Sequence, residues 1–216
     1  MHLARNLRAV FFDHDDTLFD TIGTKWAQHK HVARTYYGKE LTDEEIAPHW
    51  GKPLGAMICL LYDTTDRDTA MANVLATYRS FPKRVYPETI NVLKHVHSQG
   101  LLIGIVTATH RFSFECDLDE HAIPRETLSY TQTADESPFH KPDPRVFDQA
   151  IRWLAGLNIR PDEALYIGDS LYDFAAAGGA GFKFLGVETG LITAAQFREN
   201  GASSIPSIGC LLPGES

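Results

Sequence analysis

Cysteine is scarce in this sequence, and its distribution excludes one class of protein. The 216 residues include three cysteines, Cys59, Cys116 and Cys210, which lie far apart and lack metal-binding spacing. A disulfide-stabilised secreted domain needs a paired set of cysteines, and a structural zinc site needs clustered ones. We therefore expect reduced thiols in a cytoplasmic protein.

Long hydrophobic runs are also absent. A membrane-spanning helix needs about 20 consecutive apolar residues, and no run in the sequence approaches that length. The first ten residues, MHLARNLRAV, lack the apolar centre of a signal peptide. We expect neither a membrane partner nor export.

Positive charge is in the minority. Lys and Arg number 20 against 28 Asp and Glu, which gives a net charge of −8 at pH 7. This balance argues against nucleic acid or an anionic membrane as a partner. A small anionic substrate is compatible with it, because a local cation can reverse the field within one site. We expect a monomer or a weak homodimer.

Short apolar runs are present instead, and they predict the fold class. Helical patterns lie between them, for example at 87–98 and at 143–154, where Asp143 is a candidate cap and Pro144 takes the first helical position. Strands that alternate with helices predict an α/β fold, with a Rossmann-like parallel sheet covered on both faces. The runs that we interpret as buried parallel strands are 9–12, 101–106, 128–131, 164–167 and 182–187.

Residues 18–84 break this alternation. Apolar residues such as Trp26 and Ala33 repeat there at helical spacing, and Thr42 with Glu45 has the pattern of a capping box. We interpret this segment as a small helical domain inserted into a core formed by 1–17 and 85–216. The alternative is a set of extra helices packed flat on the sheet.

Acidic residues gather where the first predicted strand ends. In the segment RAVFFDHDDTLFDT, which starts at residue 8, an apolar run is followed at once by Asp13, Asp15 and Asp16. Ligands of open parallel sheets bind beyond the carboxyl ends of the strands. Three other predicted strands are also followed by polar residues: the second by Thr107, the third by Lys141, and the fourth by Gly168-Asp169-Ser170 with Asp173 one turn later.

These four segments, in this order, resemble the motifs of the haloacid dehalogenase superfamily. Asp13-His14-Asp15-Asp16-Thr17 is similar to the D-x-D-x-T pattern of that family, and the apolar strand IGIVT ends in Thr107. The remaining two motifs are Lys141 in HKPDP and Gly168-Asp169 followed by Asp173. The resemblance covers essentially the whole chain, since residues 18–84 stand where the phosphoglycolate phosphatase and β-phosphoglucomutase branch has a helical cap. Two positions differ: Asp16 stands where many members have glycine, and His14 where an apolar residue is usual.

The resemblance implies a Mg²⁺-dependent phosphatase of small phosphorylated metabolites. Asp13 would be the nucleophile that forms an aspartyl-phosphate, and Asp15 would protonate the leaving oxygen and later activate water. Lys141 would supply positive charge to the phosphoryl group, and Thr107 and Ala108 would bind it. Mg²⁺ takes hard oxygen ligands; those implied here are the Asp13 carboxylate, the Asp15 backbone carbonyl and Asp169, with Asp173 in support.

Two cationic residues outside the motifs are candidates for substrate binding. Arg111 follows the second motif, and Lys52 lies in the turn from Trp50 to Pro53 of the inserted segment. The histidine pairs His29/His31 and His95/His97 are spaced i,i+2 on predicted helices and therefore point apart. We expect those four histidines to be exposed rather than to bind a metal.

Four other functions are compatible with parts of this pattern. A sugar phosphomutase would use the same core and cap, and the sequence does not distinguish it from a phosphatase. A dehalogenase needs no metal, so Asp15 and the predicted metal ligands argue against it. In a receiver domain the acids precede Thr and Lys, whereas here Asp169 and Asp173 come last. A phosphate-binding protein without turnover is the fourth alternative.

Overall fold

The computed structural model describes residues 6–213, and two compact units divide the chain. One unit contains the described residues up to Asp20 and from Val85 onward, and the other contains Thr21–Arg84. We call them the core unit and the helical unit. None of the helices within 6–213 has the length and apolar character that crossing a membrane requires.

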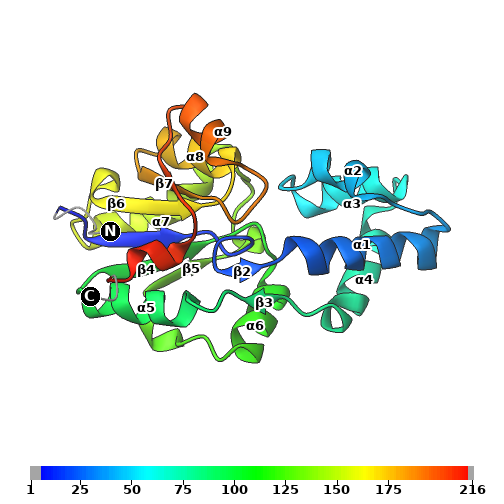
Figure 1. Ribbon diagram of the computed structural model, residues 1–216, viewed down its shortest axis with the longest axis horizontal. Coiled ribbons are helices and arrows are strands. Elements are labelled where there is room, and N and C mark those ends of the chain that lie inside the picture. Colours follow the sequence, from blue (N-terminus) through cyan, green and yellow to red (C-terminus); the bar gives the residue numbers. More distant parts are fainter. Residues whose placement is uncertain (1–5, 214–216) are drawn as a thin grey trace. The chain divides into compact units, whose positions relative to one another are not determined.

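A parallel sheet forms the centre of the core unit (Figure 1). It has six strands, in the order β5-β4-β1-β6-β7-β8. The predicted α/β fold is therefore confirmed. The five strands predicted from apolar runs are all present, with β1 as predicted and the ends of the others shifted by at most two residues. The two-residue β8 was too short to predict. The strands are β1 (Ala9–Phe12), β4 (Leu102–Val106), β5 (Tyr130–Gln132), β6 (Ala164–Gly168), β7 (Lys183–Val187) and β8 (Ser204–Ile205).

Both faces of the sheet are buried, because successive side chains of a strand point to opposite faces. In β1, Val10 and Phe12 belong to one apolar cluster, whereas Ala9 and Phe11 belong to the other. The first cluster includes residues of α5 (Thr89–Ser98) and α6 (Arg111–Glu120), and the second includes residues of α7 (Asp148–Gly156) and α8 (Leu171–Gly179). A further helix, α9 (Ala194–Glu199), follows β7.

The helix predicted at 143–154 divides into two parts. Asp143 accepts a hydrogen bond from the backbone N–H of Arg145 at 3.0 Å, and Pro144 begins a 3-10 turn that runs to Phe147. Regular α-helix starts only at Asp148. The predicted cap and proline position are confirmed, although the first turn is 3-10 rather than α.

A two-stranded sheet lies where the chain leaves the core unit and returns to it. It pairs β2 (Phe19–Asp20) with β3 (Arg84–Val85). The two connections between the units are therefore adjacent.

The helical unit has an apolar core of its own, which includes Trp26, Val32, Ile58 and Val74. The predicted capping box is present, since Thr42 Oγ1 accepts from the Glu45 N–H and the Thr42 N–H donates to the Glu45 carboxylate. The four α-helices of the unit are α1 (Ile22–Tyr37), α2 (Asp43–Ile46), α3 (Leu54–Tyr62) and α4 (Arg67–Thr77).

The prediction that the four histidines are exposed is wrong for His29. His29 of α1 is buried rather than exposed, and its Nδ1 lies 2.7 Å from the Tyr62 hydroxyl. A neutral imidazole with one hydrogen-bond partner is compatible with an apolar interior. The i,i+2 spacing of His29 and His31 shows only that the two rings point apart, and it does not show that both are exposed.

Candidate active site

The polar residues that follow β1, β4 and β6 lie at one edge of the sheet. Phe12 pairs with Ile105 of β4 and with Ile167 of β6, so the three strands end at nearly the same level. Asp13 continues this register, since its N–H donates to the Ile167 carbonyl at 2.8 Å. Because all strands are parallel, their carboxyl ends meet at this edge.

Three carboxylates gather there. Asp13, Asp169 and Asp173 each offer an oxygen, and these oxygens lie within 4.8 Å of one another. Asp173 is fixed at the start of α8, where it forms a capping box with Ser170: Ser170 Oγ lies 2.5 Å from Asp173 Oδ2. Gly168 allows this approach, because a Cβ at that position would lie 2.6 Å from Asp173 Cγ. An all-carboxylate donor set of this kind suits a hard divalent cation.

Burial changes the protonation of Asp13 and Asp169. Burial raises the pKa of Asp13 to about 7; Lys141 opposes this shift, and Asp173 and Asp15 add to it. Burial, together with Asp173, Asp16 and Asp13, also raises the pKa of Asp169 well above its usual range. Asp173 raises the pKa of both Asp13 and Asp169, which means that the carboxylates repel one another when they are ionised. A divalent cation held by these oxygens would relieve this repulsion.

Lys141 is the cation that contacts the cluster directly. Its Nζ lies 2.8 Å from Asp13 Oδ1 and 2.6 Å from Asp173 Oδ1, and the side chain is almost fully buried. Burial alone would lower the pKa of Lys141, but the charges of Asp13 and Asp173 outweigh it and raise that pKa. The ammonium therefore stays charged at neutral pH.

Asp15 is more exposed than Asp13, with 27% of its side chain accessible. The Thr109 hydroxyl donates to Asp15 Oδ2. On the other side, His14 Nδ1 lies 3.5 Å from Asp15 Oδ1, and the fully buried His14 ring has its Nε2 3.5 Å from Asp117. These contacts orient the Asp15 carboxylate, and part of its side chain stays accessible to solvent.

Thr107 and Ala108 lie beside Lys141 and line the same small pocket of the core unit. The Thr107 N–H donates to the carbonyl of Gln132, and Thr107 Oγ1 accepts from the Thr109 N–H at 3.0 Å. The pocket is also lined by Thr133, Ala134, Ser137, Phe139, His140 and Val146.

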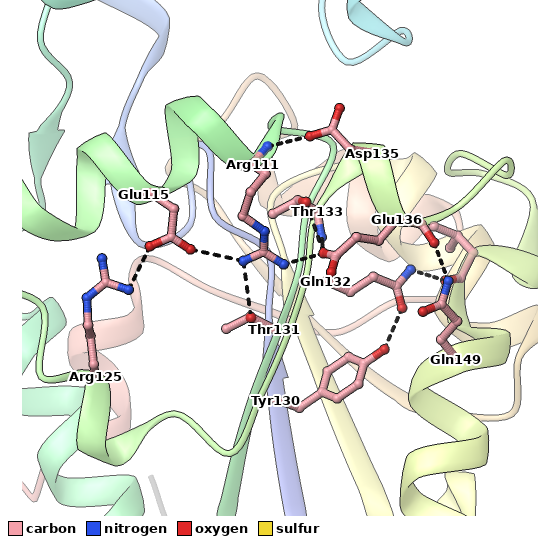
Figure 2. Close-up of polar contacts among 11 residues, drawn as sticks. Arg111, Glu115, Arg125, Tyr130, Thr131, Gln132, Thr133, Asp135, Glu136 and Gln149 are labelled. Carbon is pink, nitrogen blue, oxygen red and sulfur yellow. Dashed lines mark hydrogen bonds and ion pairs between the residues drawn. The ribbon is translucent and has the colours of Figure 1, made fainter.

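Arg111 binds acidic residues of the core unit (Figure 2). Its guanidinium lies 3.1 Å from Glu115, also pairs with Glu136, and lies within 3.4 Å of the Thr131 hydroxyl. Its backbone N–H donates to Asp135. These contacts hold α6 to the segment after β5, and a substrate contact of Arg111 stays a prediction.

Lys52 and Trp50 belong to the helical unit. Lys52 Nζ lies 2.7 Å from His49 Nδ1, and the Trp50 ring packs against Trp26 with 6.0 Å between ring centroids. A substrate contact of either residue stays a prediction.

Residues that sequence reasoning did not select also contact the site. Thr109 stands two positions after Thr107 in the segment TATH, and this spacing could have indicated it. Tyr166 is the one residue of the buried strand ALYIG whose side chain carries a polar atom. That signal could have been used, because a buried hydroxyl needs a partner.

Comparison with known proteins identifies the family to which the chain belongs. The sequence pattern of the family described as haloacid dehalogenase-like hydrolase matches residues 10–187. The chain therefore belongs to the haloacid dehalogenase-like hydrolases. This confirms the predicted family and a hydrolytic enzyme, and named phosphatases are among its relatives.

The relatives include the pyrophosphatase PpaX of Anoxybacillus flavithermus, which is 26% identical over 84% of each chain. A haloacid dehalogenase-like hydrolase from Bacteroides fragilis superposes with a TM-score of 0.82 at 27% identity, covering 95% of this chain and 100% of that one. CbbY from Rhodobacter sphaeroides, solved in complex with phosphate, has a TM-score of 0.74 at 19% identity, with 94% and 95% of the two chains covered.

Proposed function

We propose that the protein is a Mg²⁺-dependent phosphatase that hydrolyses a small phosphorylated metabolite through an aspartyl-phosphate on Asp13. The observation that carries this proposal is the contact of the buried Lys141 ammonium with both Asp13 and Asp173. It places one cation beside a candidate nucleophile and leaves the neighbouring Asp169 oxygens for a metal.

The donor set supports Mg²⁺. Asp13 and Asp169 would hold the ion, with the Asp15 backbone carbonyl as a further ligand and Asp173 in support. A Cβ on Gly190 would lie 2.0 Å from Asp169 Oδ2, so the backbone of this loop encloses the Asp169 carboxylate closely. When bound, Mg²⁺ supplies positive charge against the phosphoryl oxygens.

In the first chemical step, a carboxylate oxygen of Asp13 attacks phosphorus and the bond from phosphorus to the leaving oxygen breaks. Lys141 donates to a phosphoryl oxygen, and Thr107 with the Ala108 backbone binds the others. Asp15 gives its proton to the leaving oxygen. The Thr109 hydroxyl, which donates to Asp15, supports the orientation this transfer needs.

In the second step, water attacks the phosphorus of the aspartyl-phosphate and the bond to Asp13 breaks. Asp15, now ionised, takes the proton of the attacking water. Inorganic phosphate leaves, Asp13 is again a carboxylate, and Asp15 is again protonated.

The helical unit is proposed to act as a cap that selects the substrate. Its connections to the core unit adjoin β2, which follows the first motif directly, and β3, which precedes α5. Two adjacent connections can serve as hinges. Because curated relatives are named pyrophosphatases, inorganic pyrophosphate joins phosphorylated metabolites as a candidate substrate.

The test is phosphate release from a panel of phosphorylated metabolites and pyrophosphate, with Mg²⁺ or with EDTA. We expect turnover that requires the metal, no turnover by Asp13→Asn, and a phosphoryl group on Asp13 in acid-quenched protein. The control is Asp162→Asn, which removes a surface ion pair with Arg160 and should leave turnover unchanged. Full turnover in EDTA contradicts the metal assignment, and an isomerised sugar phosphate without net phosphate release would identify a mutase.

A further inference from the structure

Tyr166 lies in the middle of β6 with its side chain fully buried. Its ring packs edge-on against Phe147, with 4.9 Å between ring centroids. The proposed reaction does not use this residue. Its hydroxyl nevertheless reaches the polar edge of the sheet.

Three groups surround that hydroxyl. Lys141 Nζ donates to it at 2.5 Å, and the hydroxyl in turn lies 2.8 Å from the Val106 carbonyl and 3.3 Å from Asp173 Oδ1. A phenol has one proton to donate. The shorter distance favours Val106 as the acceptor, so Tyr166 links the Lys141 ammonium to the last residue of β4.

The Lys141 ammonium uses all of its donors within the protein. It has three protons, and its acceptors are Asp13 Oδ1 at 2.8 Å, Asp173 Oδ1 at 2.6 Å and the Tyr166 hydroxyl at 2.5 Å. Lys141 lies in a loop, on a flexible four-carbon stem. Its position therefore depends on these three bonds rather than on a helix or strand.

Attack by Asp13 on phosphorus changes one of the three bonds. When Asp13 carries the phosphoryl group, the Lys141 proton that pointed to Asp13 is available to a phosphoryl oxygen. The bonds to Asp173 and Tyr166 do not involve the reacting atoms. Tyr166 also connects Lys141 to Val106, the neighbour of Thr107, and so relates the positions of two groups proposed to bind the phosphoryl group.

We propose that Tyr166 is a positioning residue that, together with Asp173, holds the Lys141 ammonium in place while its third bond is exchanged between Asp13 and the substrate. This inference rests on the proposed function for its kinetic consequence, whereas the anchoring of Lys141 can be measured without turnover.

The test compares Tyr166→Phe with Tyr130→Phe. Tyr130 packs against the same apolar cluster, but its hydroxyl donates to Gln132 Oε1 at 2.7 Å rather than contacting Lys141. The first readout is hydrogen exchange of the Lys141 ammonium protons, followed by ¹⁵N NMR and assigned by loss of the signal in Lys141→Met. We expect exchange to be about tenfold faster in Tyr166→Phe, because a hydrogen bond to a charged group, whose strength corresponds to roughly a tenfold factor, is lost. We expect exchange to be unchanged in Tyr130→Phe.

The second readout is the division between kcat and KM. Misplacement of a catalytic group by about 1 Å can cost about 100-fold, so we expect kcat of Tyr166→Phe to fall by about 10- to 100-fold with little change in KM. Should Tyr166→Phe fail to fold, Tyr166→4-aminophenylalanine keeps a donor to Val106 and accepts poorly from Lys141, and the same results are expected.

The outcomes separate the inference from the proposed function. Faster exchange with reduced kcat supports both. Unchanged exchange, or faster exchange with normal kcat, overturns the positioning role of Tyr166 and leaves the phosphatase assignment intact. Faster exchange in a protein whose wild type releases no phosphate supports the anchoring of Lys141 and overturns the phosphatase assignment.

Discussion

Single residues control how closely the backbone can approach the carboxylates of the site. Gly190 is the clearest case, since an added Cβ would meet the far end of Asp169. Asp16 has a φ of 53° in the left-handed region, and its carbonyl accepts a hydrogen bond from Thr189. The loop at 189–190 therefore lies against both Asp16 and Asp169.

Gly190→Ala should lower the affinity for Mg²⁺. The new Cβ would displace the Asp169 carboxylate, and loss of support around a ligand typically costs about 10- to 100-fold in metal affinity. Calorimetric titration with Mg²⁺ measures the change. Gly156→Ala is the control, because a Cβ there meets no atom within 4 Å. Equal Mg²⁺ affinities of Gly190→Ala and Gly156→Ala would show that Asp169 is not a metal ligand.

Asp15→Asn should slow turnover by about 10²- to 10⁴-fold, as losses of general acid–base catalysis do. An asparagine can still accept from the Thr109 hydroxyl, but it cannot give or take the proton. With a substrate whose leaving group needs no proton, phosphorylated Asp13 should accumulate, and mass spectrometry of quenched protein detects it. Normal steady-state turnover with no accumulation would exclude Asp15 as the acid and base.

At the scale of elements, α1 and α3 of the helical unit are joined by a buried polar contact. His29 of α1 and Tyr62 of α3 are both buried and lie within hydrogen-bond distance. Burial, with a smaller effect from Lys25, lowers the pKa of His29 to about 4. The imidazole is therefore neutral in the folded protein at neutral pH.

The contribution of His29 to the stability of the protein should consequently fall between pH 6.5 and pH 4. The unfolded chain binds a proton at His29 below its ordinary pKa of 6.5, whereas the folded state binds it only near pH 4. The contribution of this group to the free energy of unfolding therefore decreases as the pH falls through this window. At about 1.4 kcal/mol per pKa unit, the full loss from this group is about 3 kcal/mol. Denaturant unfolding of the wild type and of His29→Gln at several pH values measures it as the difference between the two proteins, because Asp13, with its pKa raised to about 7, titrates in the same range with the opposite effect on stability.

His29→Gln should flatten this dependence, because glutamine can bond to Tyr62 without titrating. Tyr62→Phe should lower stability at every pH but keep the slope, since burial is the largest cause of the shift. An identical pH dependence of stability in His29→Gln and in the wild type would show that His29 makes no such contribution.

At the scale of the whole molecule, the chain has two units with separate apolar cores. The carboxylates, Lys141 and Thr107 all belong to the core unit, whereas Lys52 belongs to the helical unit. Under the proposed function, chemistry and metal binding reside in one unit and substrate selection in the other.

Lys52→Ala should therefore change kcat/KM unequally across a substrate panel while Mg²⁺ affinity stays constant. A difference of about 1.4 kcal/mol in transition-state binding appears as a tenfold change in preference. Lys30→Ala is the matched control, because Lys30 lies in the same unit and pairs with Asp43. Unchanged ratios of kcat/KM between substrates in Lys52→Ala would show that the specificity element lies in another part of the helical unit.

The core strands could be predicted because each is buried on both faces and reads as a short apolar run. Their exact ends could not: β5 begins at Tyr130, two residues later than predicted, because pairing with β4 starts at Gly104. The 3-10 start of the 143–154 helix also depends on packing, and burial of His29 depends on a partner 33 positions away.

By itself, the sequence determined the fold class, the family and the residues of the four motifs, since these depend on local patterns and on positions just after strands. Only the tertiary structure decided what each side chain contacts. Asp13 and Lys141 are 128 positions apart and Lys141 and Tyr166 are 25 apart, and each pair is joined by a hydrogen bond. The reason is physical: hydrogen bonds and ion pairs act over a few ångströms in space, and the parallel sheet alone brings these distant segments to one edge.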